Sequence, residues 1–227
     1  MSIPERYVRN RQAMTEAQQK RLAEASVLVL GCGGIGGYVI EHLARIGVGH
    51  IAAVDGDVFQ ASNLNRQLLC TEENIGMNKA LAGKSRVGVI NSEVSYEAFP
   101  FMVSEENIHS LIRGRDVVID CLDDPKVKLL CAKTTQREGV PFIHGAISGW
   151  CFRVHTMLPG DGIMELLCAS GDGMERRMGC LPFTAAACAC LQAAEAVKLL
   201  LGIGENTANR LIEADLLNMR FDEIFLQ

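Results

Sequence analysis

The sequence contains no Cys-x-x-Cys pair, although it has nine cysteines among its 227 residues. An odd number of cysteines at irregular spacing, several of them within apolar runs, favours reduced and mostly buried thiols over a disulfide framework. The missing pairs remove the usual spacing of a four-thiolate zinc site, so no zinc is expected. The histidines show no ligand spacing either and are interpreted as structural: His42, His50, His109, His144 and His155.

Other absences narrow the class of protein further. No apolar run approaches the roughly 20 residues that a membrane-spanning helix needs, and segment 1–11 has arginines without the apolar core of a signal peptide. The formal net charge of −5 argues against a general nucleic-acid-binding surface. We also find no internal repeat and no inter-domain linker. The sequence therefore predicts a single cytoplasmic domain with no membrane or nucleic-acid partner, long enough to bury a substantial core.

The most informative segment is a glycine-rich turn between an apolar run and a helical pattern. Val27–Leu30 is the apolar run, Gly31-Cys32-Gly33-Gly34-Ile35-Gly36 is the turn, and Tyr38–Ile46 has helical apolar spacing. In such a strand–turn–helix unit the backbone can approach a phosphate at the N-terminus of the helix. Asp55 ends a second apolar run, where a carboxylate can accept hydrogen bonds from ribose hydroxyls. These residues predict a nucleotide site that suits ATP as well as NAD.

Strand and helix patterns alternate through the first two thirds of the chain, which is typical of a largely parallel sheet with helices on both faces. Strands are expected at 27–30, 50–54, 94–98, 116–120 and 141–144, and helices at 15–25, 35–46, from Asn78, from Ser104 through Ile112, and from Pro125 to near Gly139. Between them, 58–76 is expected to be a polar loop with short helical pieces.

The last third of the chain has a different pattern. Alternation over 149–158 predicts an antiparallel strand, 161–179 a mobile crossing loop, 184–201 a helix that Gly202 ends, and 210–226 one or two closing strands. The predicted fold class is α/β, a Rossmann-like, mostly parallel sheet with helices on both faces, extended by antiparallel strands. We expect a single domain over 1–227, made of an N-terminal arm and helix (1–25), a nucleotide-binding part (26–148) and an antiparallel extension (149–227).

Charged residues beyond the glycine turn point to a triphosphate rather than to hydride transfer. Arg66 lies in the run Ser62-Asn63-Leu64-Asn65-Arg66-Gln67, and Lys79 and Asp123 follow later in the chain. Arginine offers phosphate a planar fork and lysine a point charge, while a carboxylate just after a buried strand suits Mg²⁺. Taken singly, these cations could be ordinary surface residues, and Asp124 is better suited to cap the helix at Pro125.

The complete set of motifs resembles the MoeB/ThiF/HesA family, the bacterial relatives of ubiquitin-activating enzymes. Further matches are Arg6-Tyr7-Val8-Arg9, Asp120-Cys121-Leu122-Asp123 and Leu191-Gln192-Ala193-x-Glu195-Ala196-x-Lys198. The resemblance implies that ATP and Mg²⁺ are used to adenylate the C-terminal glycine of a small ubiquitin-like sulfur carrier that ends in Gly-Gly, as in the ThiS and MoaD carriers. It also implies a homodimer.

The resemblance also implies a role for each matching residue. The expected catalytic residues are Arg9, which would reach the neighbouring subunit's site, with Arg66, Lys79 and Asp123, the last as the Mg²⁺ ligand. The expected ATP-binding set is Gly31, Gly33, Gly34, Gly36, Asp55, Asp57, Ser62, Asn63, Arg66, Lys79 and Asp123. Cys180 falls near a family cysteine on a loop over the site. The cations Arg176 and Arg177 could favour its thiolate, although adenylation needs no thiol.

Two other functions fit parts of this pattern. One is adenylation of a different carboxylate, such as a peptide terminus or a modified nucleoside on tRNA; the acidic composition argues mildly against tRNA. The other is a non-catalytic scaffold that binds NAD or another nucleotide. Arg66, Lys79 and Asp123 speak against the scaffold, because binding NAD does not require them.

Overall fold

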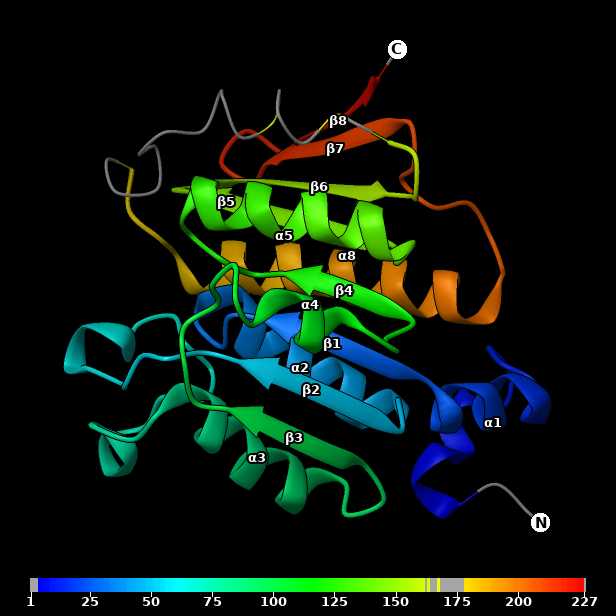
Figure 1. Ribbon diagram of the computed structural model, residues 1–227, viewed down its shortest axis with the longest axis horizontal. Coiled ribbons are helices and arrows are strands. Elements are labelled where there is room, and N and C mark those ends of the chain that lie inside the picture. Colours follow the sequence, from blue (N-terminus) through cyan, green and yellow to red (C-terminus); the bar gives the residue numbers. More distant parts are fainter. Residues whose placement is uncertain (1–3, 162, 164–166, 168–177, 227) are drawn as a thin grey trace.

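The computed structural model describes residues 4–161, 163, 167 and 178–226. Within these residues the strands form one eight-stranded sheet, in the order β3-β2-β1-β4-β5-β6-β7-β8 (Figure 1). The strands are β1 Ser26–Leu30, β2 His50–Val54, β3 Ser95–Phe99, β4 Val117–Asp120, β5 Phe142–Ser148, β6 Cys151–Met157, β7 Arg210–Asp215 and β8 Arg220–Phe225. The strands from β3 to β5 pair in parallel and those from β5 to β8 antiparallel. The predicted fold class is therefore confirmed.

Helices cover both faces of the parallel part of the sheet. The α-helices are α1 Glu16–Glu24, α2 Gly34–Ile46, α3 Lys79–Ile90, α4 Ile108–Ile112, α5 Pro125–Glu138 and α8 Pro182–Leu201, and the 3-10 helices are η1 Glu5–Asn10, η2 Ala61–Asn63 and η3 Glu72–Asn74. Helices α4 and α5 lie on one face, and α2, α3 and α8 on the other (Figure 1). Alternate residues of β1 belong to the two cores, Val27 and Val29 to one and Leu28 and Leu30 to the other. A strand that is apolar throughout is thus buried on both faces.

Three of the predicted helix starts are confirmed by cap hydrogen bonds. The side chain of Thr15 accepts a hydrogen bond from the backbone N–H of Gln18, in the predicted capping box of α1. Asn78 caps α3, and Asp124 accepts from the backbone N–H of Lys126 at 2.8 Å at the start of α5. These side chains satisfy N–H groups that have no partner within the first helical turn.

The helix predicted from Ser104 is wrong at its start. Helix α4 begins only at Ile108, because Asn107 builds a turn before it. The Asn107 side chain accepts from the backbone N–H of Ser104 at 2.9 Å and donates to the carbonyl of Met102 at 2.8 Å. An asparagine that bonds nearby backbone groups in this way competes with the helix.

Helix α8 corrects the expectation that no apolar run approaches membrane-spanning length. By length and composition alone its 20 residues could cross a membrane, yet half of its most apolar window is buried inside the protein. It packs against α2, β5 and β6. The buried carboxylate of Glu195 accepts from the Thr156 hydroxyl at 2.8 Å and from the backbone N–H of Thr207 at 2.7 Å. These contacts are those of a core helix.

The N-terminal arm is anchored rather than frayed. Tyr7, on η1, is 5% exposed and its hydroxyl accepts from the Asn91 side chain at 2.6 Å. Its ring fills the space above Gly47, where a Cβ atom would come within 2.6 Å of it. Gly47 and Asn91 directly follow α2 and α3, so the arm lies at the edge of the sheet where the parallel strands begin.

Candidate functional site

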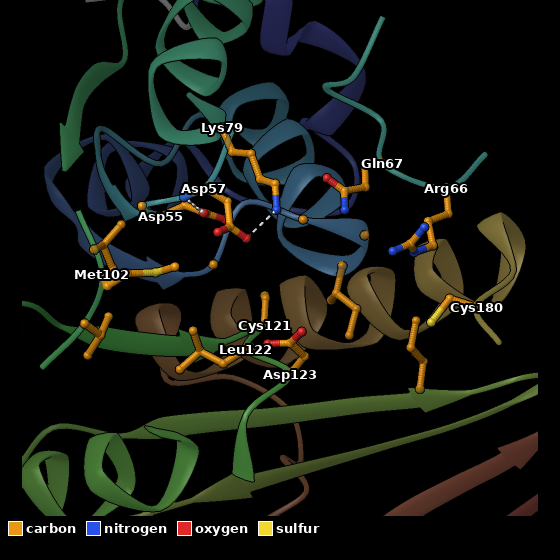
Figure 2. A pocket seen from close by; sticks show the side chains of 18 of the residues that line it. Asp55, Asp57, Arg66, Gln67, Lys79, Met102, Cys121, Leu122, Asp123 and Cys180 are labelled. Carbon is orange, nitrogen blue, oxygen red and sulfur yellow. Dashed lines mark hydrogen bonds and ion pairs between the residues drawn. The ribbon is translucent and has the colours of Figure 1, made fainter. Parts of the chain in front are cut away.

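A cleft of about 830 Å³, including its open mouth, lies at the opposite edge, where β1, β2 and β4 end (Figure 2). Ligands of open α/β sheets bind beyond the carboxyl ends of the strands, so this is the expected place. Nine of the residues that the sequence singled out line the cleft: Gly31, Gly33, Gly34, Asp55, Asp57, Arg66, Lys79, Asp123 and Cys180. Gly36, Ser62, Asn63 and Arg9 do not line it.

The glycine turn has two distinct sets of glycines. Gly31 has φ +87° and lies so close to the next strand that a Cβ atom would be 2.9 Å from the carbonyl oxygen of Cys121. Gly36 was expected in the ATP-binding set but does not line the cleft. It is needed for packing, because its Cβ would be 1.9 Å from the Gly31 carbonyl oxygen. Gly33 and Gly34 do line the cleft, and α2 begins there without a side-chain cap. An uncapped helix N-terminus at a cleft suits an anion.

Asp55 is held rigidly by the backbone around it. One carboxylate oxygen accepts from the backbone N–H of Cys32 at 2.8 Å, and the other from that of Asp57 at 2.9 Å. Burial raises the pKa of Asp55, and the two backbone bonds counteract part of that rise. The carboxylate therefore joins the glycine turn to the end of β2. It also faces the cleft, so it is available for the ribose that the sequence predicted.

Lys79 enters the cleft from the first residue of α3. Its side chain is 10% exposed, and Nζ lies 2.9 Å from Oδ2 of Asp57. The backbone N–H of Lys79 donates to the carbonyl of Asp57 at 3.0 Å, and the Asn78 amide donates to the carbonyls of Asp55 and Asp57. The ammonium group is thus placed at the cleft by the end of β2.

Arg66 lies at the other end of the cleft, beside Cys180 (Figure 2). Its Nη1 donates to the carbonyl of Ser62 at 3.1 Å and to the Asn65 side chain at 2.9 Å. Asn63 does not reach the cleft; its side chain accepts from the backbone N–H of Gln60 at 3.0 Å and caps η2. Ser62 and Asn63, predicted to bind ATP, therefore shape the loop that carries Arg66.

Gln67 was missed as a site residue, although it ends the predicted run. It is 6% exposed, its amide nitrogen lies near Gly33, and its Oε1 has no hydrogen-bond partner among the described residues. Phe101, Met102 and Val103, which also line the cleft, were missed too. They lie beyond Asp55, just after β3, and only their place after a strand could have indicated them. Their apolar side chains suit a flat base.

Asp123 is an exposed carboxylate that faces the glycine turn across the cleft (Figure 2). Among the residues described, no group of three or more His, Cys, Asp or Glu side chains could hold a metal ion by itself. A single carboxylate is nonetheless what Mg²⁺ uses when substrate phosphates supply the other oxygen ligands. Asp123, with Lys79 and Arg66 nearby for the phosphates, fits that kind of site.

Two backbone contacts place Cys180 at the cleft. Its carbonyl accepts from the Asn65 side chain at 3.2 Å, and the residue pairs with Gly149 in a short parallel bridge. The backbone thus brings the end of the predicted crossing loop to the cleft. Most of that loop, including the cations Arg176 and Arg177 that were expected to act on the thiol, lies outside the described residues.

Arg9 is exposed on η1, at the edge of the sheet where Tyr7 is anchored and the cleft is not. The parallel strands run the length of the sheet between this arm and the glycine turn (Figure 1). Arg9 is therefore not brought together with Arg66, Lys79 and Asp123 within one chain.

The model of the ThiF family matches residues 7–227, which is nearly the whole chain. The chain belongs to the ThiF family. Its relatives include the SAMP-activating enzyme E1 of Haloferax volcanii, 34% identical over 218 residues, covering 91% of this chain and 78% of the relative. The sulfur carrier protein adenylyltransferase of Thermus thermophilus is 33% identical and covers 91% and 80%. The predicted family is thus confirmed.

The ThiF-family chain also shares its fold with solved structures. A crystal structure of E. coli MccB with ATP superposes with a TM-score of 0.86 at 23% sequence identity, covering 99% of this chain and 72% of that one. A structure of PaaA gives a TM-score of 0.79 at 22% identity, covering 92% and 66%. At these identities the likeness establishes the fold alone.

Proposed function

We propose that this protein adenylates the C-terminal glycine of a small ubiquitin-like sulfur carrier, as a homodimer in the cytoplasm. The protein is an adenylyltransferase, in agreement with its ThiF family and with the names of its relatives. The observation that carries the proposed ATP chemistry is the convergence of Arg66, Lys79 and Asp123 on one cleft built around the glycine turn.

The reaction needs little covalent chemistry from the protein. A carboxylate oxygen of the carrier attacks the α-phosphorus of ATP, the bond to the β-phosphate oxygen breaks, and acyl-adenylate and pyrophosphate result. Charge grows on the phosphate oxygens, so catalysis comes from positioning and from fixed positive charge. In the proposal, Asp55 holds the ribose, Gly33 and Gly34 lie under the phosphates, and Lys79 and Arg66 bind phosphate oxygens. Mg²⁺ on Asp123, when bound, neutralises part of the phosphate charge.

The choice of a carrier protein as the acyl substrate rests on the relatives. Their names describe a SAMP-activating enzyme, a sulfur carrier protein adenylyltransferase and a ThiS adenylyltransferase; the last, from Bacillus subtilis, is 37% identical over 144 residues. Arg66 and Cys180 line the cleft away from Lys79, and the carrier's extended C-terminus is proposed to enter beside them. A terminal Gly-Gly suits this entry, because it has no side chains that the cleft would have to hold.

Two features support the homodimer. Helix α8 is apolar on almost all sides, yet Phe183, Cys190 and Ala194 are exposed on it. A helix of this composition is normally covered all round, which a second copy of the chain would achieve. The position of Arg9, at the edge away from its own cleft, agrees with a role in the partner's site.

The deciding experiment is ATP–pyrophosphate exchange with purified carriers that end in Gly-Gly. Exchange is expected with at least one such carrier, and not with the same carrier shortened by its terminal glycine. Parallel reactions with a peptide terminus and with tRNA test the other acyl substrates, and calorimetric titrations with ATP and NAD test the nucleotide. Exchange with a peptide or tRNA alone, or tight NAD binding without ATP binding, would contradict the proposal.

A further inference from the structure

A cluster of three buried titratable side chains lies behind Asp123 and takes no part in the proposed chemistry. Asp120, Lys128 and His144 are 0%, 6% and 3% exposed. Oδ2 of Asp120 accepts from Nζ of Lys128 at 2.8 Å and lies 2.9 Å from Nδ1 of His144. Nζ of Lys128 also donates to the carbonyl of Gly145 at 2.8 Å. The cluster joins β4, α5 and β5 directly beneath the cleft.

The members of this cluster shift one another's pKa values. Burial alone would raise the pKa of Asp120, but the Lys128 ammonium and the His144 ring lower it overall. Burial, followed by the Lys128 ammonium, lowers the pKa of His144 to about 4. At neutral pH these lowered pKa values leave Asp120 as a carboxylate and His144 as a neutral imidazole. A buried carboxylate is stable in this setting only because both partners are present.

The second oxygen of Asp120 connects the cluster to the site. Oδ1 accepts from the backbone N–H of Leu122 at 3.1 Å. Leu122 lines the cleft and directly precedes Asp123. Since Lys128 fixes one oxygen of the carboxylate, the other oxygen is held against the turn that presents Asp123.

The same turn also packs against the glycine turn. The backbone N–H of Cys121 donates to the carbonyl of Leu30 at 2.9 Å, and the Cys121 carbonyl lies against Gly31. The amide of Gln192, from α8, donates to the carbonyl of Asp120 at 2.8 Å. A small movement of Cys121 or Leu122 would therefore move Asp123 and disturb the floor under the phosphates at the same time.

We propose that Asp120 is a positioning residue, whose Oδ1 holds the backbone N–H of Leu122 and so sets the place of the Asp123 carboxylate. The effect on Mg²⁺ rests on the proposed function, whereas the effect on the Leu122 backbone does not. Asp120 touches neither substrate nor metal in this account. Its role differs from plain stabilisation, because it depends on one hydrogen bond that can be removed separately from the charges.

Two double variants separate the hydrogen bond from the charges. D120N/K128M removes both charges but leaves an oxygen that can accept from the Leu122 N–H, whereas D120L/K128M removes the charges and the acceptor. Both avoid an unpaired buried charge, so both are expected to fold. Arg137→Met, at an exposed position on the same helix, is the matched control for losing a cation from α5.

The first measurement is hydrogen exchange at the Leu122 amide. Exchange in D120N/K128M is expected within about threefold of wild type, and about tenfold faster or more in D120L/K128M, the effect of losing one hydrogen bond. The second is calorimetric titration of ATP at increasing Mg²⁺. The half-saturating Mg²⁺ concentration should rise about tenfold in D120L/K128M and stay within about threefold in D120N/K128M and Arg137→Met.

Equal hydrogen exchange at the Leu122 amide in the two double variants overturns the proposal. The proposal is also overturned if, across the variants, the half-saturating Mg²⁺ concentration correlates with the thermal midpoint and not with exchange at Leu122. If wild type binds no ATP, the proposed function fails, but the exchange comparison still decides the positioning role. If D120L/K128M does not fold, Leu122→Pro removes the same N–H donor, with Leu122→Ala as its control. A Mg²⁺ requirement about tenfold above that control supports the proposal, and an unchanged one overturns it.

Discussion

Lys79 and Asp57 form an ion pair at the cleft, with 2.9 Å between Nζ and Oδ2. The pair is asymmetric, because the Lys79 side chain is 10% exposed and that of Asp57 is 54% exposed. The backbone N–H of Asp57 in turn donates to Asp55. The ammonium group that we propose for phosphate binding is thus held beside the carboxylate that we propose for the ribose.

This arrangement predicts that substitutions of Lys79 and of Asp57 lower ATP–pyrophosphate exchange by different amounts. Lys79→Ala should lower ATP–pyrophosphate exchange about a hundredfold or more, since losing one transition-state contact typically costs roughly 3 kcal/mol. Asp57→Asn should lower it about fivefold or less, because a largely exposed ion-pair partner contributes on the order of 1 kcal/mol or less. Lys84→Ala, on an exposed position of the same helix, should be close to wild type. A Lys79→Ala enzyme within a few-fold of wild type would remove Lys79 from the site.

Arg66→Ala and Asp123→Ala are each expected to lower exchange by about the same hundredfold, for the same reason. Cys180→Ala should retain carrier adenylation, because the attack of a carboxylate on ATP needs no thiol. These variants are compared by exchange rate at equal thermal stability. Loss of exchange in a folded Cys180→Ala protein would show that the thiol takes part earlier than we propose.

The two sets of glycines make a second prediction. Gly36→Ala should lower the thermal midpoint markedly, since its Cβ would meet the Gly31 carbonyl oxygen at 1.9 Å and overpacking of this kind costs about 1 to 3 kcal/mol or more. Gly34→Ala should fold normally, since its Cβ would meet side chains at 3.7 Å or more, but should weaken ATP binding. Calorimetry gives both the midpoint and the affinity. Equal midpoints for the two variants would contradict the packing role of Gly36.

The sequence predicted the sheet and the cleft well because local chemistry decides them. Apolar runs bounded by glycine, and caps such as Thr15, Asn78 and Asp124, are visible in a short window of sequence. The sequence also placed Asp55 and Lys79 correctly at the cleft, because both directly adjoin elements that end or begin there.

Two features that the sequence did not predict depend on contact between residues far apart in the sequence. Asn63, which was expected at the phosphates, is a different case, because its side chain makes a local contact and accepts from the backbone N–H of Gln60 in the same turn. The Asp120–Lys128–His144 cluster was not predicted, since its members meet only when β4, α5 and β5 come together. The anchoring of the arm by Tyr7 was not predicted either, because its partner Asn91 lies 84 residues away.

His144 predicts how stability depends on pH. Its pKa is lowered to about 4 in the folded protein, by burial and then by Lys128, with a smaller contribution from His155 and an opposing one from Asp120. The unfolded chain, with an ordinary pKa near 6.5, binds this proton more readily, so stability is present above pH 6.5 and is lost as pH falls toward 4. The lowered pKa of Asp120 acts in the same direction at still lower pH.

Between pH 7 and pH 4.5 the loss from His144 should be about 2 to 3 kcal/mol. Denaturant unfolding of wild type and His144→Gln at the two pH values measures it. The variant should lose less stability than wild type by about that amount. Equal losses of stability in wild type and His144→Gln would show that other groups, such as His42, control how stability falls with pH.

The last prediction concerns Arg9, which lies on η1 at the edge of the sheet away from its own cleft. Since η1 is anchored there by Tyr7 and Asn91, Arg9 cannot serve the site of its own chain without unfolding that contact. In a homodimer it would instead reach the partner's phosphates, as arginines supplied by a second protein do in other phosphoryl-transfer enzymes. Arg9→Ala and Lys79→Ala homodimers should therefore both be nearly inactive.

Mixing the two inactive homodimers tests whether Arg9 acts across the interface. A mixed dimer places both lesions in one site, because the site without Lys79 also faces the subunit without Arg9, and the other site is left whole. Random subunit exchange gives about half mixed dimers with one intact site of two, so roughly a quarter of wild-type activity should return. Exchange of subunits is followed separately with differently tagged chains. If the tags mix and no activity returns, Arg9 either acts within its own subunit or takes no part in the reaction.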